Sequence, residues 1–267
     1  MAFGSFFVLF LHFRFHPPLK HHPLSSVLLC QPPQIYKSHL AGSSNPSSNN
    51  RRPIIQPGGN GAVDSARANL AATYVNAFVN AGFGTDKLMT PEGNEWLYKN
   101  KDHGMLAASA SLGSLLLWNV EEGLTEIDKF LYSNDLNVKA GAFLGVGVLS
   151  CGVRNDADPA LALLIEHVTS EDKIMKVAAI EGLGIAYSGT CRNDVSELLV
   201  PIVEESEIGG DFLEVGLAGL SLGLINVGNG DDCSDVVSAM VTRLMECSDD
   251  ELNFAVRVNI ITDDRNL

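Results

Sequence analysis

Four glycine-rich segments recur along the middle of the chain at nearly constant spacing. Their anchor glycines are Gly113, Gly147, Gly184 and Gly223, which stand 34, 37 and 39 residues apart. Five residues beyond each anchor is a second glycine, except that Trp118 holds this place in the first copy. Self-similarity at such a period is the signature of stacked helical repeats. The sequence therefore predicts an all-α repeat protein.

Each repeat has two parts of opposite composition. The first is rich in Gly, Ala and Ser and almost uncharged, which is expected of helices packed too closely for larger side chains. The second has the pattern of an amphipathic helix with a charged face. The four predicted amphipathic helices are Gly123–Ser133, Asp158–Thr169, Asp194–Val203 and Asp235–Cys247. Small inner helices alternating with charged outer helices predict an α-solenoid of helix hairpins.

Charge divides the chain sharply near residue 63. Residues 1–63 contain no Asp or Glu and hold five of the seven histidines, whereas from Asp64 onward 32 acids stand against 13 bases, a net charge of −19. The N-terminal stretch also holds a Ser/Asn/Pro tract at 43–50. Such a composition does not bury enough apolar surface to fold. We therefore expect residues 1–61 to be a disordered, low-complexity leader.

The leader contains one apolar run, residues 6–11, which is followed by Arg14 and Lys20. The run is too short to span a bilayer, and a secretory signal has its bases before the apolar region. No membrane association is therefore predicted. The absence of acids fits an organelle transit peptide. The favoured alternative is a start foreign to the rest of the chain, from an alternative exon or a wrong gene model.

The five cysteines, at positions 30, 151, 191, 233 and 247, show no paired spacing. Those at 151, 191 and 233 recur with the repeat, so free thiols in a reducing compartment are expected. Only His103 and His167 are available as histidine ligands in the folded part. The sequence therefore predicts no metal site and no cofactor.

No catalytic constellation emerges from the spacing, so no enzyme is predicted. The glycines at 145–147 and 182–184 resemble parts of nucleotide-binding loops, but no strand precedes them and the pattern repeats, so close helix packing explains them. His103 beside Asp102 would be half of a dyad, but no nucleophile is placed to join it. A helix-capping or core role is favoured for this pair. The negative charge of the folded part argues against binding to nucleic acid.

Three runs of sequence carry a resemblance to a known family. They are residues 63–84, 86–90 and 96–105, and the match continues through the repeats and into residues 152–164. The chain resembles the non-ATPase regulatory subunit 2 family of the 26S proteasome, the largest subunit of the base of the regulatory particle, and plant members in particular. A related subunit of the same particle also carries such repeats, but the first and third runs favour this family.

The resemblance covers about residues 62–255 and implies a domain organisation. Residues 62–104 would form helices that lead into the repeats, 105–255 about four proteasome/cyclosome repeats, and 256–267 a tail foreign to the family. In the family the complete array closes into a toroid of inner and outer helices. Four repeats cannot close a ring, so an open arc of that toroid is expected.

The resemblance also implies a function. It implies a non-catalytic scaffold that docks ubiquitin or the ubiquitin-like domains of shuttle receptors and supports the ATPase ring, in cytoplasm and nucleus. The implied partners are the ATPase ring subunits, other regulatory-particle subunits, ubiquitin and these receptors. Two alternatives stay open. One is a purely structural assembly subunit without ubiquitin contact, and the other is a truncated fragment without function.

The resemblance implies docking residues on the outer helices. They are Leu124 and Asp128 on the first docking helix, Asp194 and Glu197 on the middle one, and Asp235 and Glu246 on the last. In the last helix Thr242 replaces a third acid of the family. Asp235 and Glu246 are eleven residues apart, three helical turns, and so share one face. An ordinary solvated face is the alternative interpretation of these acids.

Overall fold

The computed structural model describes residues 61–91, 94–204 and 212–246, and all regular structure in these ranges is helical. The chain divides into two units, Met1–Asp64 and Ser65–Leu267. Of the first unit only residues 61–64, the start of a helix, are described. The expected leader up to residue 60 and the expected tail at 256–267 lie outside the described residues. The all-α prediction is confirmed.

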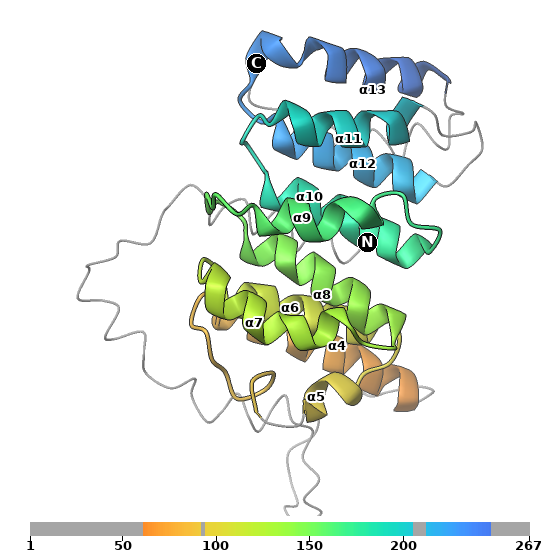
Figure 1. Cartoon of the computed structure of the whole chain (residues 1–267). Coiled ribbons are helices and arrows are strands. Elements are labelled where there is room, and N and C mark those ends of the chain that lie inside the picture. Colours follow the sequence, from red (N-terminus) through yellow and green to blue (C-terminus); the bar gives the residue numbers. More distant parts are fainter. Residues whose placement is uncertain (1–60, 92–93, 205–211, 247–267) are drawn as a thin grey trace, which may run out of the picture. The chain divides into compact units, whose positions relative to one another are not determined.

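The second unit is built from two layers of helices (Figure 1). Helices α6, α8, α10 and α12 contact one another in succession as an inner layer, α7, α9 and α11 pack against them as an outer layer, and α13 extends the outer layer through its contact with α11. The bounds are α4 Gly61–Val79, α5 Glu95–Tyr98, α6 His103–Leu115, α7 Val120–Leu131, α8 Leu136–Leu149, α9 Pro159–Leu164, α10 Lys173–Ala186, α11 Asn193–Glu204, α12 Phe212–Ile225 and α13 Ser234–Glu246. Helices packed in a row in this way are the arrangement of an α-solenoid.

The predicted amphipathic helices are all present in the outer layer, and three of them differ from the prediction by at most three residues at either end. The exception is the second, expected at Asp158–Thr169, which is the short helix α9 followed by a 3-10 turn at Ile165–His167. Pro159 at the first helical position favours the start of α9. His167 packs on Phe143 of α8, with ring centroids 4.3 Å apart.

The anchor glycines lie where the inner helices meet backbone to backbone. A Cβ on Gly113 of α6 would lie 2.2 Å from the carbonyl oxygen of Gly145 in α8, and one on Gly147 would lie 2.4 Å from that of Gly182 in α10. A Cβ on Gly184 of α10 would lie 2.4 Å from the side-chain oxygen of Ser221 in α12 and 2.7 Å from its Cα. A side chain at any of these three positions would force the helices apart. Close helix packing is therefore confirmed as the reason for Gly147 and Gly184, whereas a Cβ on Gly145 would make only ordinary contacts, the nearest at 3.5 Å.

The residues five places beyond the anchors end each inner helix in the left-handed conformation. Their φ angles are +69° at Trp118, +75° at Gly152, +61° at Gly189 and +86° at Gly228. Trp118 therefore occupies the closing position predicted for it, although glycine adopts this conformation more readily. The N–H of Gly189 donates to the carbonyl of Leu224 at the end of α12, at 2.7 Å. Such a turn ties the end of one inner helix to the next.

Candidate functional site

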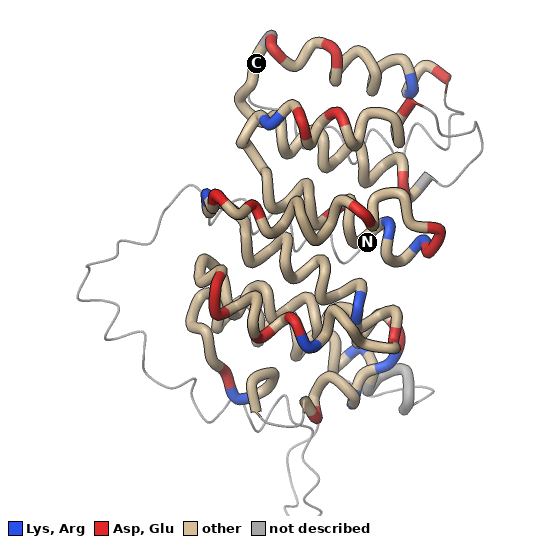
Figure 2. Tube along the Cα trace, viewed as in Figure 1, with Lys and Arg blue, Asp and Glu red and all other residues tan. Residues whose placement is uncertain are grey.

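Acidic side chains are concentrated on the outer layer, as Figure 2 shows. Helices α7, α11 and α13 carry nine Asp and Glu residues, whereas the four inner helices together carry two. The inner helices are uncharged over most of their length because their surfaces are buried against one another. The outer layer is therefore the part of the described structure that offers charged groups to a partner.

The predicted acids of α13 lie at its two ends, and both are exposed. On an ideal helix with about 100° per residue, Asp235, Thr242 and Glu246 fall within about 40° of one another. Asp235 stands in the first turn, where the helix dipole stabilises a negative charge. Glu246 lies 3.6 Å from the guanidinium of the buried Arg243, which is a loose contact. Both carboxylates are therefore accessible to a partner.

An apolar stripe runs along the same helix, centred about a third of a turn around the axis from these acids. Val237, Val241 and Met245 recur at four-residue spacing, and their side chains are 49%, 50% and 83% exposed. Single exposed apolar residues are ordinary, whereas a stripe of them on one helix marks a candidate interaction surface. This stripe was not predicted from the sequence, although the four-residue spacing of Val237, Val241 and Met245 is a signal for it.

Helix α11 contacts α13 and carries the predicted residues Asp194 and Glu197, both exposed. The Nε of Arg192 donates to one carboxylate oxygen of Asp194 at 2.9 Å, and a terminal nitrogen of Arg192 pairs with the other. These hydrogen bonds from Arg192 hold the pKa of Asp194 below its ordinary value. Pro201 has no N–H to donate to the carbonyl of Glu197, so the helix is weakened one turn beyond this residue.

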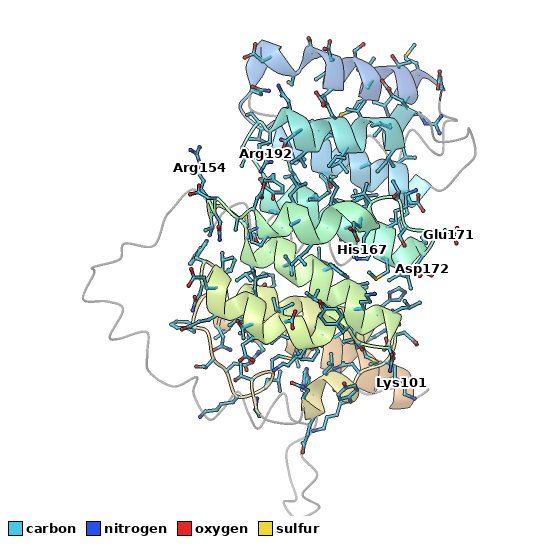
Figure 3. All side chains as sticks on the ribbon, viewed as in Figure 1. Lys101, Arg154, His167, Glu171, Asp172 and Arg192 are labelled. Carbon is cyan, nitrogen blue, oxygen red and sulfur yellow. The ribbon has the colours of Figure 1, made fainter. Side chains whose placement is uncertain are left out.

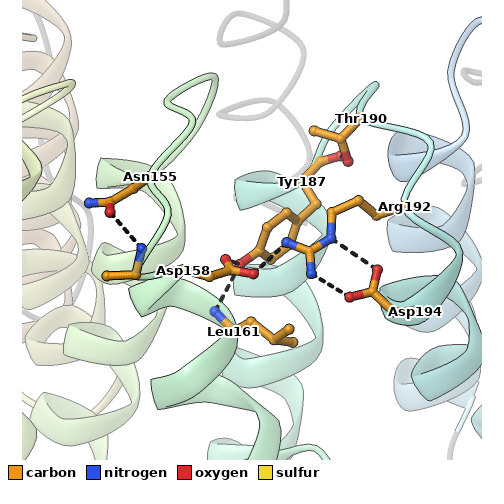
Figure 4. A network of polar contacts seen from close by, with 8 residues as sticks. Asn155, Asp158, Leu161, Tyr187, Thr190, Arg192 and Asp194 are labelled. Carbon is orange, nitrogen blue, oxygen red and sulfur yellow. Dashed lines mark hydrogen bonds and ion pairs between the residues drawn. The ribbon is translucent and has the colours of Figure 1, made fainter.

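Arg192 belongs to a polar network that joins the ends of α9, α10 and α11 (Figure 4). Its guanidinium also pairs with Asp158, and it stacks 4.8 Å from the ring centre of Tyr187. The Tyr187 hydroxyl donates to Asp158 and accepts from the backbone N–H of Leu161 at 2.9 Å. Burial and the bond to Asp158 raise the pKa of Tyr187 above its ordinary value. This network was not predicted from the sequence.

The structure divides the six predicted docking residues into two groups. Asp194 and Glu197 on α11 lie next to α13 with its two acids. Leu124, half-buried, and Asp128, exposed, lie on α7, and α9 stands between α7 and α11 in the outer row (Figure 1). The first predicted docking helix is therefore not a neighbour of the middle one.

A cavity of about 670 Å³ opens beside α7, between this helix, the end of α6 and the segment at residues 82–90. Met89, Leu112 and Phe130 give it apolar walls, while Glu122 and Glu126 of α7 also line it. Three threonines and Lys129 add further polar groups to the lining.

The pair Asp102 and His103, considered above as half of a dyad, lies at the start of α6, and the nearby Trp96 belongs to α5. Asp102 precedes α6 but its side chain makes no capping hydrogen bond, and both Asp102 and His103 are exposed, so a core role for this pair is wrong. Trp96 is buried and donates its Nε1–H to the Thr73 hydroxyl at 2.9 Å, so its ring is not presented to solvent.

Beyond the network around Arg192, the labelled charged residues lie on both sides of the view in Figure 3. Figure 3 shows Arg154 and Arg192 on one side of the view and Lys101, Glu171 and Asp172 on the other. Within residues 61–91, 94–204 and 212–246, no three His, Cys, Asp or Glu side chains come together as a metal site, and no helix has the length and hydropathy needed to cross a membrane.

The cysteines of the described part lie near the repeat ends, as expected. Cys191 and Cys233 carry free thiols and are half-buried, and Cys151 is buried. The Cys233 thiol donates to the carbonyl of Gly230 at 3.0 Å. These positions fit packing roles at the turns.

Comparison with known proteins gives consistent relatives. No family model matches the chain. It is 44% identical over 201 residues to the 26S proteasome non-ATPase regulatory subunit 2 of Dictyostelium discoideum, a match that covers 75% of this chain and 20% of that protein. It is 42% identical over 225 residues to the 26S proteasome regulatory subunit rpn1 of Schizosaccharomyces pombe, covering 82% of this chain and 24% of that protein.

A plant relative gives higher identity over a shorter stretch. The 26S proteasome non-ATPase regulatory subunit 2 homolog B of Arabidopsis thaliana is 52% identical over 143 residues, which cover 50% of this chain and 14% of that protein. The chain thus spans at most about a quarter of the length of the curated relatives it matches.

Proposed function

We propose, from the premise that this chain belongs to the family of the 26S proteasome non-ATPase regulatory subunit 2, that it is a non-catalytic scaffold of the proteasome regulatory particle. In this proposal its outer helices dock ubiquitin and the ubiquitin-like domains of shuttle receptors, in cytoplasm and nucleus. Its inner helices hold this surface in place next to the ATPase ring and other regulatory-particle subunits. The names of the relatives, regulatory and non-ATPase subunits, support a role without catalysis.

One observation carries the docking proposal. It is the exposed surface of α13, which we call the α13 face and define as Asp235, Val237, Val241, Met245 and Glu246. Ubiquitin presents an apolar patch ringed by basic residues. An exposed apolar stripe beside accessible carboxylates is complementary to that patch in both hydrophobicity and charge.

Neighbouring residues extend the proposed surface. Glu197 lies on α11, which contacts α13, and adds a third exposed carboxylate beside the α13 face. Leu124 and Asp128 on α7 are separated from these helices by α9 and are proposed as a second, independent contact point. Thr242 lies between the two acids of α13 and adds an uncharged hydroxyl to the proposed surface.

An NMR titration tests this proposal. Isotope-labelled ubiquitin, and separately a ubiquitin-like domain of a shuttle receptor, is titrated with the 267-residue chain and with the double variant Asp235→Lys/Glu246→Lys. We expect saturable shifts on the apolar patch of ubiquitin and affinity weakened at least about tenfold in the variant, because two attractive contacts become repulsive. The matched control is Glu166→Lys/Glu171→Lys, which makes the same change of charge at exposed positions away from α13.

Two outcomes would contradict the proposal. Equal loss of binding in the control and in the double variant would mean that total charge, and not the α13 face, governs binding. No shift with a chain that circular dichroism shows to be helical would remove the docking role. Co-purification with the ATPase ring would then test the remaining alternative, an assembly subunit without ubiquitin contact.

A further inference from the structure

Arg192 is the one basic residue at the start of α11. Its backbone follows a turn that is fixed on α12, since Gly189 N–H donates to Leu224 at 2.7 Å and Cys191 N–H donates to Ile225 at 3.0 Å. Its side chain is then held on three sides, by Asp194, by Asp158 and by the ring of Tyr187. A guanidinium held by two carboxylates and an aromatic ring is pre-organised in a single position.

The two acids of α11 differ in what they offer a partner. Both oxygens of Asp194 accept hydrogen bonds from Arg192, in the two-pronged geometry that is the strongest form of this pair. Glu197 is exposed one turn further along the helix. By contrast, Glu246 of α13 is 3.6 Å from its arginine, so its carboxylate is free to exchange partners.

We infer that Arg192 sets the edge of the proposed docking surface by neutralising Asp194 within the chain, so that Glu197 and the α13 face, and not Asp194, meet the bases of the partner. This inference rests on the proposed function and names a residue that determines its specificity. A base of the partner would have to displace Arg192 from two hydrogen bonds before it reached Asp194. The α9–α11 junction is therefore closed to a basic ligand.

A double-mutant cycle in ubiquitin binding tests the inference. The probe is isotope-labelled ubiquitin at physiological ionic strength, where charges further than about 8 Å apart are largely screened. We expect Asp194→Asn to change the affinity by less than about 1.5-fold. Arg192→Gln should tighten binding roughly two- to fivefold, because it releases the carboxylates of Asp194 and Asp158. The double variant Arg192→Gln/Asp194→Asn should lose most of this gain, which a purely structural role of Arg192 does not explain.

The variant Arg192→Lys tests whether the positive charge of Arg192 is sufficient to neutralise Asp194, or whether the two parallel hydrogen bonds of the guanidinium, here called the guanidinium fork, are needed. Lysine keeps the positive charge but not the two-pronged geometry, so we expect this variant to tighten binding by less than Arg192→Gln does. Affinity equal to that of the parent chain would overturn the role of the fork. Carbon-detected titration of the Asp194 carboxyl in the unliganded chain gives a readout that needs no partner. Its pKa should lie below the ordinary value of 3.8 in the parent chain and return toward it in Arg192→Lys or Arg192→Gln.

The outcomes distinguish this inference from the proposal beneath it. Binding by the parent chain that Asp194→Asn weakens severalfold would overturn the inference alone, since Asp194 would then be a contact residue. A complete absence of binding in all variants would overturn both. If circular dichroism shows that Arg192→Gln does not fold, the affinities of Arg192→Lys and Asp194→Asn still test whether Arg192 neutralises Asp194.

Discussion

The inner and outer layers of this protein use opposite kinds of surface. Along α8, residues 140–149 are buried without exception, and at Gly147 the backbone of this helix lies against the backbone of α10. Along α7 only Val120, Gly123, Ile127, Phe130 and Leu131 are buried, and the face between them is charged. The inner layer therefore depends on glycines that let neighbouring helices touch. The outer layer instead presents charged side chains to solvent.

The difference between the two layers indicates which positions tolerate substitution. An inner position that touches a neighbouring backbone accepts only glycine, because any added atom must move a whole helix. An outer position facing solvent accepts most residues without loss of stability, so its acids and exposed apolar residues are free to serve binding. Changes in the inner layer should affect folding, and changes in the outer layer should affect partners.

The largest effect is expected from Gly147→Ala. Its Cβ would lie 2.4 Å from the carbonyl oxygen of Gly182, so α8 and α10 must separate. We expect a loss of about 2 kcal/mol in the free energy of unfolding, after the favourable helix propensity of alanine is included. Urea denaturation followed by circular dichroism measures it.

Gly145→Ala is the matched control on the same helix. The nearest atom to its added Cβ is 3.5 Å away, an ordinary contact. This variant should be unchanged or gain up to about 1 kcal/mol from helix propensity. Equal free energies of unfolding for Gly147→Ala and Gly145→Ala would contradict the claim that backbone contacts between inner helices require glycine.

A smaller effect is expected at the junction of the two layers, from Tyr187→Phe. The change removes the hydroxyl that accepts from Leu161 N–H and donates to Asp158. Unfolding free energy should fall by about 1–2 kcal/mol because a donor and an acceptor lose their partner. Thermal denaturation would show it, and ubiquitin binding should be retained. A variant as stable as the parent would show that the network does not hold the layers together.

The repeat was predictable from the sequence for a physical reason. Gly147 is required by a close helix–helix contact, and the closing positions, including Trp118, are required by a left-handed turn. Both features recur in each repeat. Such constraints leave a pattern in the order of residues. The layers and the choice of inner and outer helices follow directly from that pattern.

The network around Arg192 was not predictable in this way. Arg192 meets Asp158 across 34 positions of sequence, and the contact depends on how α9 packs beside α10. The separation of α7 from α11 by α9, in contrast, follows from the order of the outer helices in the sequence. Contacts between side chains of different repeats do not recur at a fixed spacing. The sequence therefore suggested Asp194 as a docking residue but did not reveal that its carboxylate accepts hydrogen bonds from Arg192.

The smallest effect concerns pH and the outer layer. The pKa of Asp194 is lowered by hydrogen bonds from Arg192, so the stabilisation from this pair is present above the ordinary pKa of 3.8 and is lost as the pH falls through the lower folded value. The pair is partly exposed, which limits its contribution to less than about 1 kcal/mol. The melting temperatures of the parent chain and Asp194→Asn should differ slightly at pH 6, and the difference should shrink as the pH falls below 3.8. A difference that stays constant as the solution is acidified below pH 3.8 would contradict the ion pair.

Hydrogen–deuterium exchange of the whole chain, with and without saturating ubiquitin, tests the central claim most directly. The claim is that the inner layer builds the fold while α11 and α13 meet the partner. The account predicts slower exchange in α13 and in α11 when ubiquitin is bound, with unchanged exchange in α6 and α8. Unchanged exchange in α13 together with protection of the inner helices would contradict it.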